Sequence, residues 1–464
     1  MTNHQRSRIA WFSPLPPVPS GVAVYNGDLL AVLDEEMAID RFVYHSRSLR
    51  AAEPGPARPF ERPSRSARVF DAHDFVWKHQ REPYDLITYQ LGNATCHDYM
   101  WAYLARYPGL VVLHDPRLHH ARARQLLNRG RADDYRREFQ YDHPDAARDF
   151  VEYAVEGLGG PIYYFWSMLR VVMRTARLVA VHNPRVAADL RDEFPDVRVE
   201  AIRLGGRPLA AEPGAAMRVR TALGVPDSAV LFAAFGKLTA EKRIAPIIRA
   251  FAALVRERAD VHLLLAGDAA DFPTLGTELA SAAIAARVHV SGYLPDDAVG
   301  AYLTAADACL CLRWPTALET SGSWLHCLSA ARPTVISDLA HLVDIPSVDP
   351  RSWRSSTSPA PGVAPVTIAI DLLEEEESLL LAMRRLATDP RLRADLGRAG
   401  HAYWAANHTV EIMANDYRRL IAIAAGRAAP EVHDLPRHFT EDHSDTARAI
   451  AARFGLELDQ ILES

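Results

Sequence analysis

The stretch FGKLTAEKR at 235–243 is the first candidate for chemistry, because it holds two of the three lysines in a chain whose 52 basic residues are otherwise arginines. It follows an apolar, strand-like run and precedes a run with helical periodicity. A helix N-terminus attracts anions through its free N–H groups and its dipole, and lysine adds a compact positive charge. We predict that Lys237 and Lys242 bind a diphosphate. The alternative is a pair of solvated lysines on a surface turn.

A second candidate is LRWPTALETSGSWLHCL at 312–328, which again follows an apolar run. Glu319 precedes Thr320, and the small residues Ser321 and Gly322 would expose backbone N–H groups where the next helix starts. Such a nest binds an anion or a sugar hydroxyl. A simple helix cap at Thr320 or Ser321 is the alternative, and it leaves Glu319 unexplained.

Two further stretches place polar residues after predicted strands. SPLPPVPSGVAVYNGDLL at 13–30 opens a helix near Gly21, and VVLHDP places His114 and Asp115 at a strand end. A lone histidine is more often structural than catalytic, but His114 stands at the carboxyl end of a strand that faces the expected cleft, and both interpretations stay open. Neither stretch has the GxGxxG or Walker pattern of a nicotinamide or P-loop site.

The totals exclude several classes of protein. A net charge of −6 argues against a dedicated nucleic-acid binder, which would carry a basic surplus. No apolar run reaches the length of a signal peptide core or of a membrane span. The cysteines form neither a zinc pattern nor a disulfide framework, so we expect a reducing, cytoplasmic location. They are Cys96, Cys309, Cys311 and Cys327.

Short apolar runs alternate with segments of helical length along most of the chain. This alternation is typical of parallel strands that helices cover on both faces. A Gly-, Pro- and Ala-rich stretch at 205–216 interrupts it once and reads as a linker. The predicted strands are 8–13, 40–45, 85–91, 109–115, 178–183 and 197–204 before the linker, and 229–236, 261–267, 287–293, 308–313 and 333–338 after it.

The pattern predicts an α/β protein with two Rossmann-like domains facing across a cleft, an N-terminal domain at 1–205 and a C-terminal domain at 206–404. A helix at 405–428 and a polar tail at 429–464 follow. Ligands of such sheets bind outside the carboxyl ends of the strands, so the active site belongs between the domains.

One segment of the first domain departs from the alternation. Residues 116–176 form a predicted helical insertion that is rich in arginine and contains the run YYFW. It could bind an acceptor, rest on an anionic membrane surface, contact a second copy in a homodimer, or simply pack as helices. The residues leave these alternatives open.

Taken together, these motifs resemble the retaining nucleotide-sugar glycosyltransferases of the GT-B fold, in particular the bacterial family 4 group, over roughly 8–425. The order of motifs carries the resemblance: a Ser/Gly loop, a strand-end His, a G-basic-L-x-x-E-K segment, a GY strand end, YLTAAD at 302–307, and a Glu-containing loop before a helix. The segments YQLGNATCHDYM and YPGLVVLHDPRLHH strengthen it. The helix near 405–425 matches the family's C-terminal helix, which crosses back onto the first domain.

The resemblance implies a role for each candidate in the second domain. Lys237 and Lys242 would bind the departing diphosphate. Glu319 would lie beside the hydroxyls of the donor sugar, and the Ser321–Gly322 backbone would contact sugar or phosphate. Main-chain groups of Gly292, Tyr293 and Leu294 would hold the base.

For the first domain, the resemblance implies that Gly21 lets its loop approach the diphosphate and donor sugar. His114 would lie near the reacting carbon, where it bonds the donor sugar or orients the acceptor. The implied activity moves a hexosyl unit from a UDP- or GDP-linked donor to a glycan, lipid-linked or small-molecule acceptor with retention of configuration. It implies no metal and no cofactor besides the donor.

The chain departs from the family pattern at two positions. The usual Glu-x7-Glu pattern would place its second glutamate, which grips the ribose, where this chain has Cys327. Lys237 stands where arginine is common, and lysine lacks the bidentate fork. A non-catalytic binding or partner subunit and a nucleotide-sugar epimerase are therefore kept as alternatives.

Overall fold

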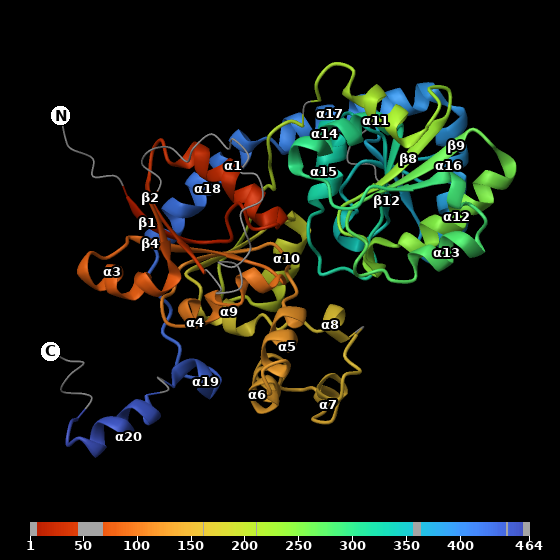
Figure 1. Ribbon diagram of the computed structural model, residues 1–464. Coiled ribbons are helices and arrows are strands. Elements are labelled where there is room, and N and C mark those ends of the chain that lie inside the picture. The colour runs from red at the N-terminus through yellow and green to blue at the C-terminus, as the bar shows by residue number, and fades with distance from the viewer. Residues whose placement is uncertain are drawn as a thin grey trace, which may run out of the picture.

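The computed structural model describes residues 7–44, 68–160, 162–209, 211–355, 363–441 and 444–457. Two parallel seven-stranded sheets form two lobes that lie side by side (Figure 1). The first has the order β3-β2-β1-β4-β5-β6-β7, and the second has the order β10-β9-β8-β11-β12-β14-β13. Helices are interleaved with the strands in both lobes. The predicted pair of Rossmann-like domains is confirmed.

The strands are β1 Arg8–Phe12, β2 Ala38–Val43, β3 Arg68–Asp71, β4 Leu86–Leu91, β5 Leu110–Leu113, β6 Leu178–Val181, β7 Val199–Ala201, β8 Val230–Phe235, β9 Val261–Ala266, β10 Val288–Val290, β11 Ala308–Cys311, β12 Thr334–Ser337, β13 Ser347–Val348 and β14 Thr367–Ile370.

The helices are α1 Gly21–Leu33, α3 Phe75–Arg81, α4 Met100–Leu104, α5 His119–Leu127, α6 Ala132–Asp142, α7 Phe150–Val155, α8 Ile162–Phe165, α9 Arg170–Thr175, α10 Pro184–Glu193, α11 Ala215–Leu223, α12 Ile244–Glu257, α13 Leu275–Ser281, α14 Asp296–Ala305, α15 Gly322–Ser329, α16 Glu375–Thr388, α17 Pro390–Asn407, α18 Val410–Ala425, α19 Arg437–Thr440 and α20 Asp445–Arg453, with short 3-10 turns η1 Ala72–Asp74, η2 Thr95–His97, η3 Ala240–Lys242, η4 Ala285–Arg287 and η5 Ala340–Leu342.

Three strands were not predicted. β3 is an edge strand whose residues are exposed or half-buried, so it lacks the apolar run that marks the other strands. β13 and β14 complete the far edge of the second sheet. β13 has two residues and lies within 346–366, a stretch rich in Pro and Ser, which is a composition typical of loops. Residues 356–362 of that loop lie outside the described part of the chain.

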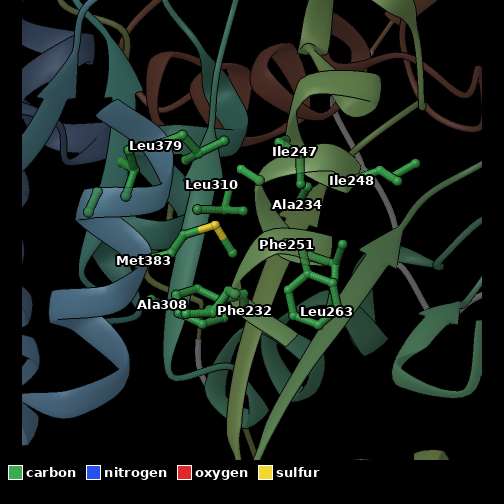
Figure 2. Close-up of a cluster of buried hydrophobic side chains, with 14 of the residues drawn as sticks. Phe232, Ala234, Ile247, Ile248, Phe251, Leu263, Ala308, Leu310, Leu379 and Met383 are labelled. Atoms are coloured by element: carbon green, nitrogen blue, oxygen red, sulfur yellow. The ribbon is translucent and has the colours of Figure 1, made fainter. Parts of the chain in front are cut away.

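The central strands of the second sheet are buried on both faces, which explains their apolar sequence. Phe232 and Ala234 of β8 face α12 and α16, where they pack against Phe251 and Met383 (Figure 2). The alternate residues of β8 pack on the other face, against Leu303 of α14 and Cys327 of α15. Side chains of a strand alternate between faces, so covering both faces requires an uninterrupted apolar run.

The chain returns from the second lobe to the first between α17 and α18. α17 packs closely against α15, whereas α18 lies beside α1 on the first lobe (Figure 1). Thr409 caps α18, because its side chain accepts a hydrogen bond from Ile412 N, and Gly206 forms a β-bridge with Thr409. Met413 and Tyr417 of α18 are fully buried in a core of the first lobe.

Five helices, α5 to α9, occupy most of the predicted insertion 116–176. A small separate apolar core lies around Tyr135 and Phe139, whereas α9 packs into the core of the first lobe. Two helices, α19 and α20, lie in the expected polar tail, of which 442–443 and 458–464 lie outside the described residues. Phe439 of α19 is buried against the first lobe beside Trp101. Within the described ranges, no helix combines the length and the apolar character needed to cross a bilayer.

Candidate functional site

The carboxyl ends of the two sheets face each other across the domain boundary. Thr320, in the loop before α15, donates a hydrogen bond from Oγ1 to the carbonyl of His182, which follows β6 (3.2 Å). Asn183 donates to the carbonyl of His341, which lies in η5 after β12 (2.7 Å). The loops predicted to bind ligands therefore meet between the domains.

The insertion also reaches the second domain. The hydroxyl of Tyr164, in α8, donates to Oε1 of Glu241 in η3 (2.6 Å). The backbone carbonyl of Glu241 accepts from the N–H of Trp314 (2.8 Å), which ties η3 to the loop after β11. One contact region is thus formed by three elements: the loop after β8, the loop after β11, and helix α8 of the first domain.

Lys242 lies at the end of η3, directly beneath the turn that follows β8. Its Nζ donates to the carbonyl of Phe235 (2.6 Å). Gly236 has φ +92°, which favours glycine, and a Cβ there would lie 2.2 Å from Lys242 Nζ and would displace it. Burial, reinforced by the positive charge of Arg313, lowers the pKa of Lys242 to about 7. A group poised this way becomes fully charged when an anion arrives.

Lys237 differs sharply from Lys242. Its side chain is 55% exposed and pairs with Asp271 (Nζ–Oδ2 2.5 Å) in the loop after β9. An exposed ion pair of this kind contributes little to stability, so Lys237 can exchange its partner for a phosphate. The structure does not show the two lysines converging, and the predicted diphosphate contact of Lys237 stays a prediction.

Glu319 is held from two sides in the loop after β11. Its Oε1 pairs with Nε of Arg313 (2.9 Å), and its Oε2 accepts from Oγ1 of Thr316 (2.9 Å). Its negative charge also acts on Lys242 and on Asp115 of the first domain. Glu319 therefore has a fixed orientation at the centre of the facing edges.

The N-terminus of α15 follows immediately. Ser321 caps it, because its Oγ accepts from the N–H of Trp324 (3.3 Å). Gly322 is the first helical residue, and nothing lies within 4 Å of the position its Cβ would take. The free N–H groups of this helix end are open to an anion. The predicted cap and the predicted nest are thus compatible at this position.

Gly21 occupies the corresponding place in the first domain, as the first residue of α1 after β1. Ser20 caps the helix by accepting from Val22 N (3.3 Å). Gly21 is exposed and nothing lies within 4 Å of its Cβ position. The backbone there is accessible to a ligand.

His114 follows β5, but its ring points into the first domain. Its Nε2 lies 2.8 Å from the amide of Gln90, and its Nδ1 lies 3.3 Å from Nε2 of His182. Burial holds the pKa of His114 well below its usual range, with smaller contributions from His182 and His97. The ring is neutral, and both nitrogens have protein partners. A bond from the ring to a sugar would require one nitrogen to be released.

Asp115 is a carboxylate that the motif placed at the strand end but that was not singled out. Its Oδ2 accepts from the N–H of Asn93 (2.7 Å), and the residue is partly exposed. Burial and, to a smaller extent, the charge of Glu319 together raise its pKa to about 6, against opposing effects of the Asn93 N–H and Arg313. Two carboxylates, one from each domain, thus influence each other across the boundary.

The residues expected to hold the base follow β10. Gly292 has φ +69°, which favours glycine. Tyr293 is 65% exposed, and Leu294 packs partly against the core near β8 and α14. No contact links these residues to Lys242 or Glu319, and their role stays a prediction.

Cys327 is fully buried, on the face of α15 that packs against the sheet. Its Sγ lies 3.7 Å from Sγ of Cys311. The thiol therefore contacts the core, and it is not available to a ribose. Burial raises its pKa well above the usual range.

Among the described residues, no three His, Cys, Asp or Glu side chains are grouped as a metal ion requires. The absence of a metal from the reaction remains an expectation, since the structure holds no ligands of any kind.

Residues 229–349 match the family model described as "Glycosyl transferases group 1". This segment begins just before β8 and ends after β13, so it contains Lys242, Arg313 and Glu319. No curated protein matches the chain significantly in sequence.

Solved structures match nearly the whole chain. Sucrose-phosphate synthase from Thermosynechococcus elongatus matches with a TM-score of 0.61 and 17% identity over 90% of this chain and 100% of its own. HepE of Anabaena in complex with UDP-glucose matches with a TM-score of 0.59 and 14% identity over 89% and 99%. WaaG, a glycosyltransferase involved in lipopolysaccharide biosynthesis, matches with a TM-score of 0.55 and 13% identity over 90% and 100%.

The chain has the GT-B fold. At these identities the structural likeness establishes the fold alone, and the roles of individual residues rest on the geometry above. In this GT-B protein the structure brings together Lys242, Glu319 and the Ser321–Gly322 helix end. It places Gly21 and His114 in the facing domain, and leaves Lys237 and Gly292–Leu294 apart.

Sequence reasoning missed several groups at this GT-B domain boundary. Arg313 is one of many arginines, and only its distance to Glu319 distinguishes it. Asp115 follows His114 in the sequence, so the strand-end argument applied to both. Tyr164 and Glu241 are distant in sequence, and no local pattern could have paired them.

Proposed function

We propose that this protein is a retaining glycosyltransferase that moves a hexosyl unit from a UDP- or GDP-linked donor to an acceptor hydroxyl. The observation that carries the proposal is the convergence of Lys242, Arg313 and Glu319 at the carboxyl end of the second sheet. This cluster lies within the segment that matches the glycosyltransferase family model. HepE, whose fold is similar, was solved with UDP-glucose.

The nucleotide diphosphate would bind against the turn after β8 and the N-terminus of α15. Lys242 is partly neutral near pH 7 in the free protein, and a diphosphate would raise its pKa and make it a cation. Arg313 adds a permanent positive charge. Together with the free N–H groups at Ser321–Gly322, these groups stabilise the charge that develops as the glycosyl–phosphate bond breaks.

Glu319 would accept hydrogen bonds from the sugar hydroxyls. Arg313 and Thr316 hold its carboxylate, so the sugar would meet an oriented acceptor. The acceptor oxygen would attack the anomeric carbon on the face that the diphosphate leaves, and its proton would pass to a phosphate oxygen of the leaving group. Configuration is then retained without a carboxylate pair of glycosidase type.

The proposal is tested by incubating the protein with a panel of UDP- and GDP-hexoses and measuring the nucleotide released without acceptor. We expect slow release from one donor, abolition in Glu319→Ala, and thermal stabilisation by the matching nucleoside diphosphate. At a hundred times its dissociation constant such a ligand stabilises by about 2.7 kcal/mol. Arg249→Ala is the matched control, because Arg249 lies on the exposed side of α12 and pairs with Glu376. No release and no stabilisation by any nucleotide would refute the proposal.

A non-catalytic binding protein is the second candidate, and Cys327 favours it. The carboxylate that the family uses for the ribose is replaced by a thiol buried in the core. This candidate predicts that a nucleotide stabilises the protein while no donor is turned over, so the same panel separates the two.

A further inference from the structure

A line of buried hydrogen bonds connects the crossing helix α18 to His114. The hydroxyl of Tyr25, in α1, donates to the hydroxyl of Tyr417, in α18 (2.7 Å). The Tyr417 oxygen lies 3.0 and 3.1 Å from the two terminal atoms of the Gln90 amide. Oε1 of the same amide lies 2.8 Å from Nε2 of His114. Gln90 and Tyr417 are completely buried.

The line continues beyond His114 to the domain boundary. His114 Nδ1 lies 3.3 Å from Nε2 of His182, and Nδ1 of His182 lies 3.3 Å from the carbonyl of Ile202. The backbone carbonyl of His182 accepts from Thr320 of the second domain (3.2 Å). The line therefore ends at the loop that carries Glu319.

The partners fix where each proton lies. The Ile202 carbonyl can only accept, so His182 carries its proton on Nδ1 and accepts through Nε2. His114 must then donate from Nδ1, which leaves Nε2 as an acceptor. Burial lowers the pKa of both rings, that of His182 to about 4, so neither carries a second proton.

The Gln90 amide completes the assignment. Oε1 of Gln90 is drawn beside His114 Nε2, but because that nitrogen accepts, the amide must be turned so that its NH2 group takes this place. The amide oxygen then accepts from the Tyr417 hydroxyl, which lies about equally far from both ends of the amide. Tyr417 can donate to Gln90 because its own oxygen accepts from Tyr25. Each hydrogen bond of the line is then donated in the same direction, from the Tyr25 hydroxyl toward the Ile202 carbonyl.

We propose that Gln90 and Tyr417 are positioning residues, which together with His182 hold the neutral His114 ring with its proton on Nδ1. The consequence for catalysis rests on the proposed glycosyl transfer. An imidazolium beside an oxocarbenium-like sugar would oppose the transition state electrostatically, and a freely rotating ring would not hold a fixed position. Through Tyr417, the helix that crosses between the domains supports the histidine predicted to lie near the reacting carbon.

The direct test is the tautomer of His114, measured by 15N NMR on protein labelled at histidine and assigned with His114→Asn. We expect the wild-type signals to show the proton on Nδ1. Tyr417→Phe removes the donor to the Gln90 oxygen and lets the amide turn. The tautomer then depends on the two longer contacts of His182 alone (3.3 Å each), so a second tautomer should appear. Gln90→Glu replaces the amide donor by an acceptor and should move the proton to Nε2. Wild-type tautomer signals in both variants would overturn the proposal.

Tyr89→Phe is the matched control. Tyr89 neighbours Gln90 on β4, is fully buried, and donates its hydroxyl to the carbonyl of Tyr107 (2.9 Å), away from the line. This variant loses a comparable buried hydrogen bond, and we expect it to keep the wild-type tautomer. If Tyr89→Phe changes the tautomer as Tyr417→Phe does, the effect is general loosening and the positioning role is refuted.

Kinetics provides the second readout. We expect Tyr417→Phe to lower kcat by about tenfold, because the His114 ring loses its fixed position, with donor KM nearly unchanged because the nucleotide binds the second domain. An equal fall in Tyr89→Phe would contradict the role. If no donor is turned over by the wild type, the glycosyltransferase proposal fails, and the NMR result still decides whether Gln90 and Tyr417 set the tautomer.

Discussion

At the scale of single residues, the two lysines of the opening motif have different surroundings. Lys237 is exposed and paired with Asp271, whereas Lys242 is enclosed by the turn after β8 and its pKa falls to about 7. The motif predicted that both lysines bind the diphosphate, and the sequence alone could not distinguish the buried lysine from the exposed one. Their difference depends on how deeply each side chain is buried.

Lys242 gives the binding of a nucleoside diphosphate a defined pH dependence. The pKa of Lys242 is about 7 in the free protein and rises in the complex. Above pH 7, binding of the diphosphate is therefore accompanied by uptake of a proton by Lys242. Affinity should therefore fall as pH rises from 7 to 9, by up to about tenfold per unit. Lys242→Arg keeps its charge throughout and should flatten the dependence. Calorimetry at several pH values measures it.

The control is Lys237→Ala, which removes an exposed cation and leaves Lys242 in place. Lys237→Ala should weaken binding of the nucleoside diphosphate modestly and leave the pH dependence of the affinity unchanged. A wild-type affinity that is constant from pH 7 to 9 would exclude Lys242 as the titrating group.

The two carboxylates that meet across the domain boundary provide a second test. Glu319 helps to raise the pKa of Asp115 to about 6, so Glu319→Gln should lower the pKa of Asp115. A 13C NMR titration of the aspartate carboxyls would show the midpoint of Asp115 moving to lower pH. An unchanged midpoint would mean that the two groups do not face each other in solution.

At the scale of elements, the predicted strands agree with the structure wherever both faces of a strand are covered. Two of the three missed strands, β3 and β13, are edge elements. β3 is largely exposed, and β13 has two residues, so neither needs the continuous apolar run that identifies a central strand. The third, β14, is buried between β12 and β13, but its apolar run has only four residues and follows a Pro- and Ser-rich stretch. What the sequence pattern encodes is burial on two faces, and it encodes edge pairing only weakly.

The site depends on α17, because α17 supports α15, whose N-terminus is the predicted anion site. Gly397 lets α17 approach the turn that directly follows α15, since a Cβ there would lie 2.3 Å from the carbonyl of Ala331. Gly397→Ala should lower stability by about 2 kcal/mol through the forced backbone shift. It should also weaken nucleotide binding by displacing α15. Thermal unfolding with and without nucleotide measures both effects.

Gly276→Ala is the matched control for that substitution. Gly276 is an exposed residue of α13, and nothing lies within 4 Å of its Cβ position. Alanine favours a helix over glycine by about 0.5–1 kcal/mol, so this variant should be at least as stable as the wild type. Equal behaviour of the two variants would show that the α15–α17 contact is not close.

At the scale of the whole molecule, the chain links its domains at points far apart in sequence. α18 carries Tyr417 from the end of the second domain into the core of the first, and Tyr164 of the insertion contacts Glu241. The tail expected to be polar contributes Phe439 to the first domain. None of these contacts has a local sequence signal, because each joins residues that only the folded chain brings together.

The measurement that tests the account most directly is 1H NMR of the sugar released from an α-linked UDP- or GDP-hexose. It detects cleavage and anomeric configuration in one experiment. We predict that the α-anomer appears first, before mutarotation, and that Glu319→Ala releases none. A β-anomer formed first would contradict retention, and no cleavage of any donor would contradict the proposed transfer itself.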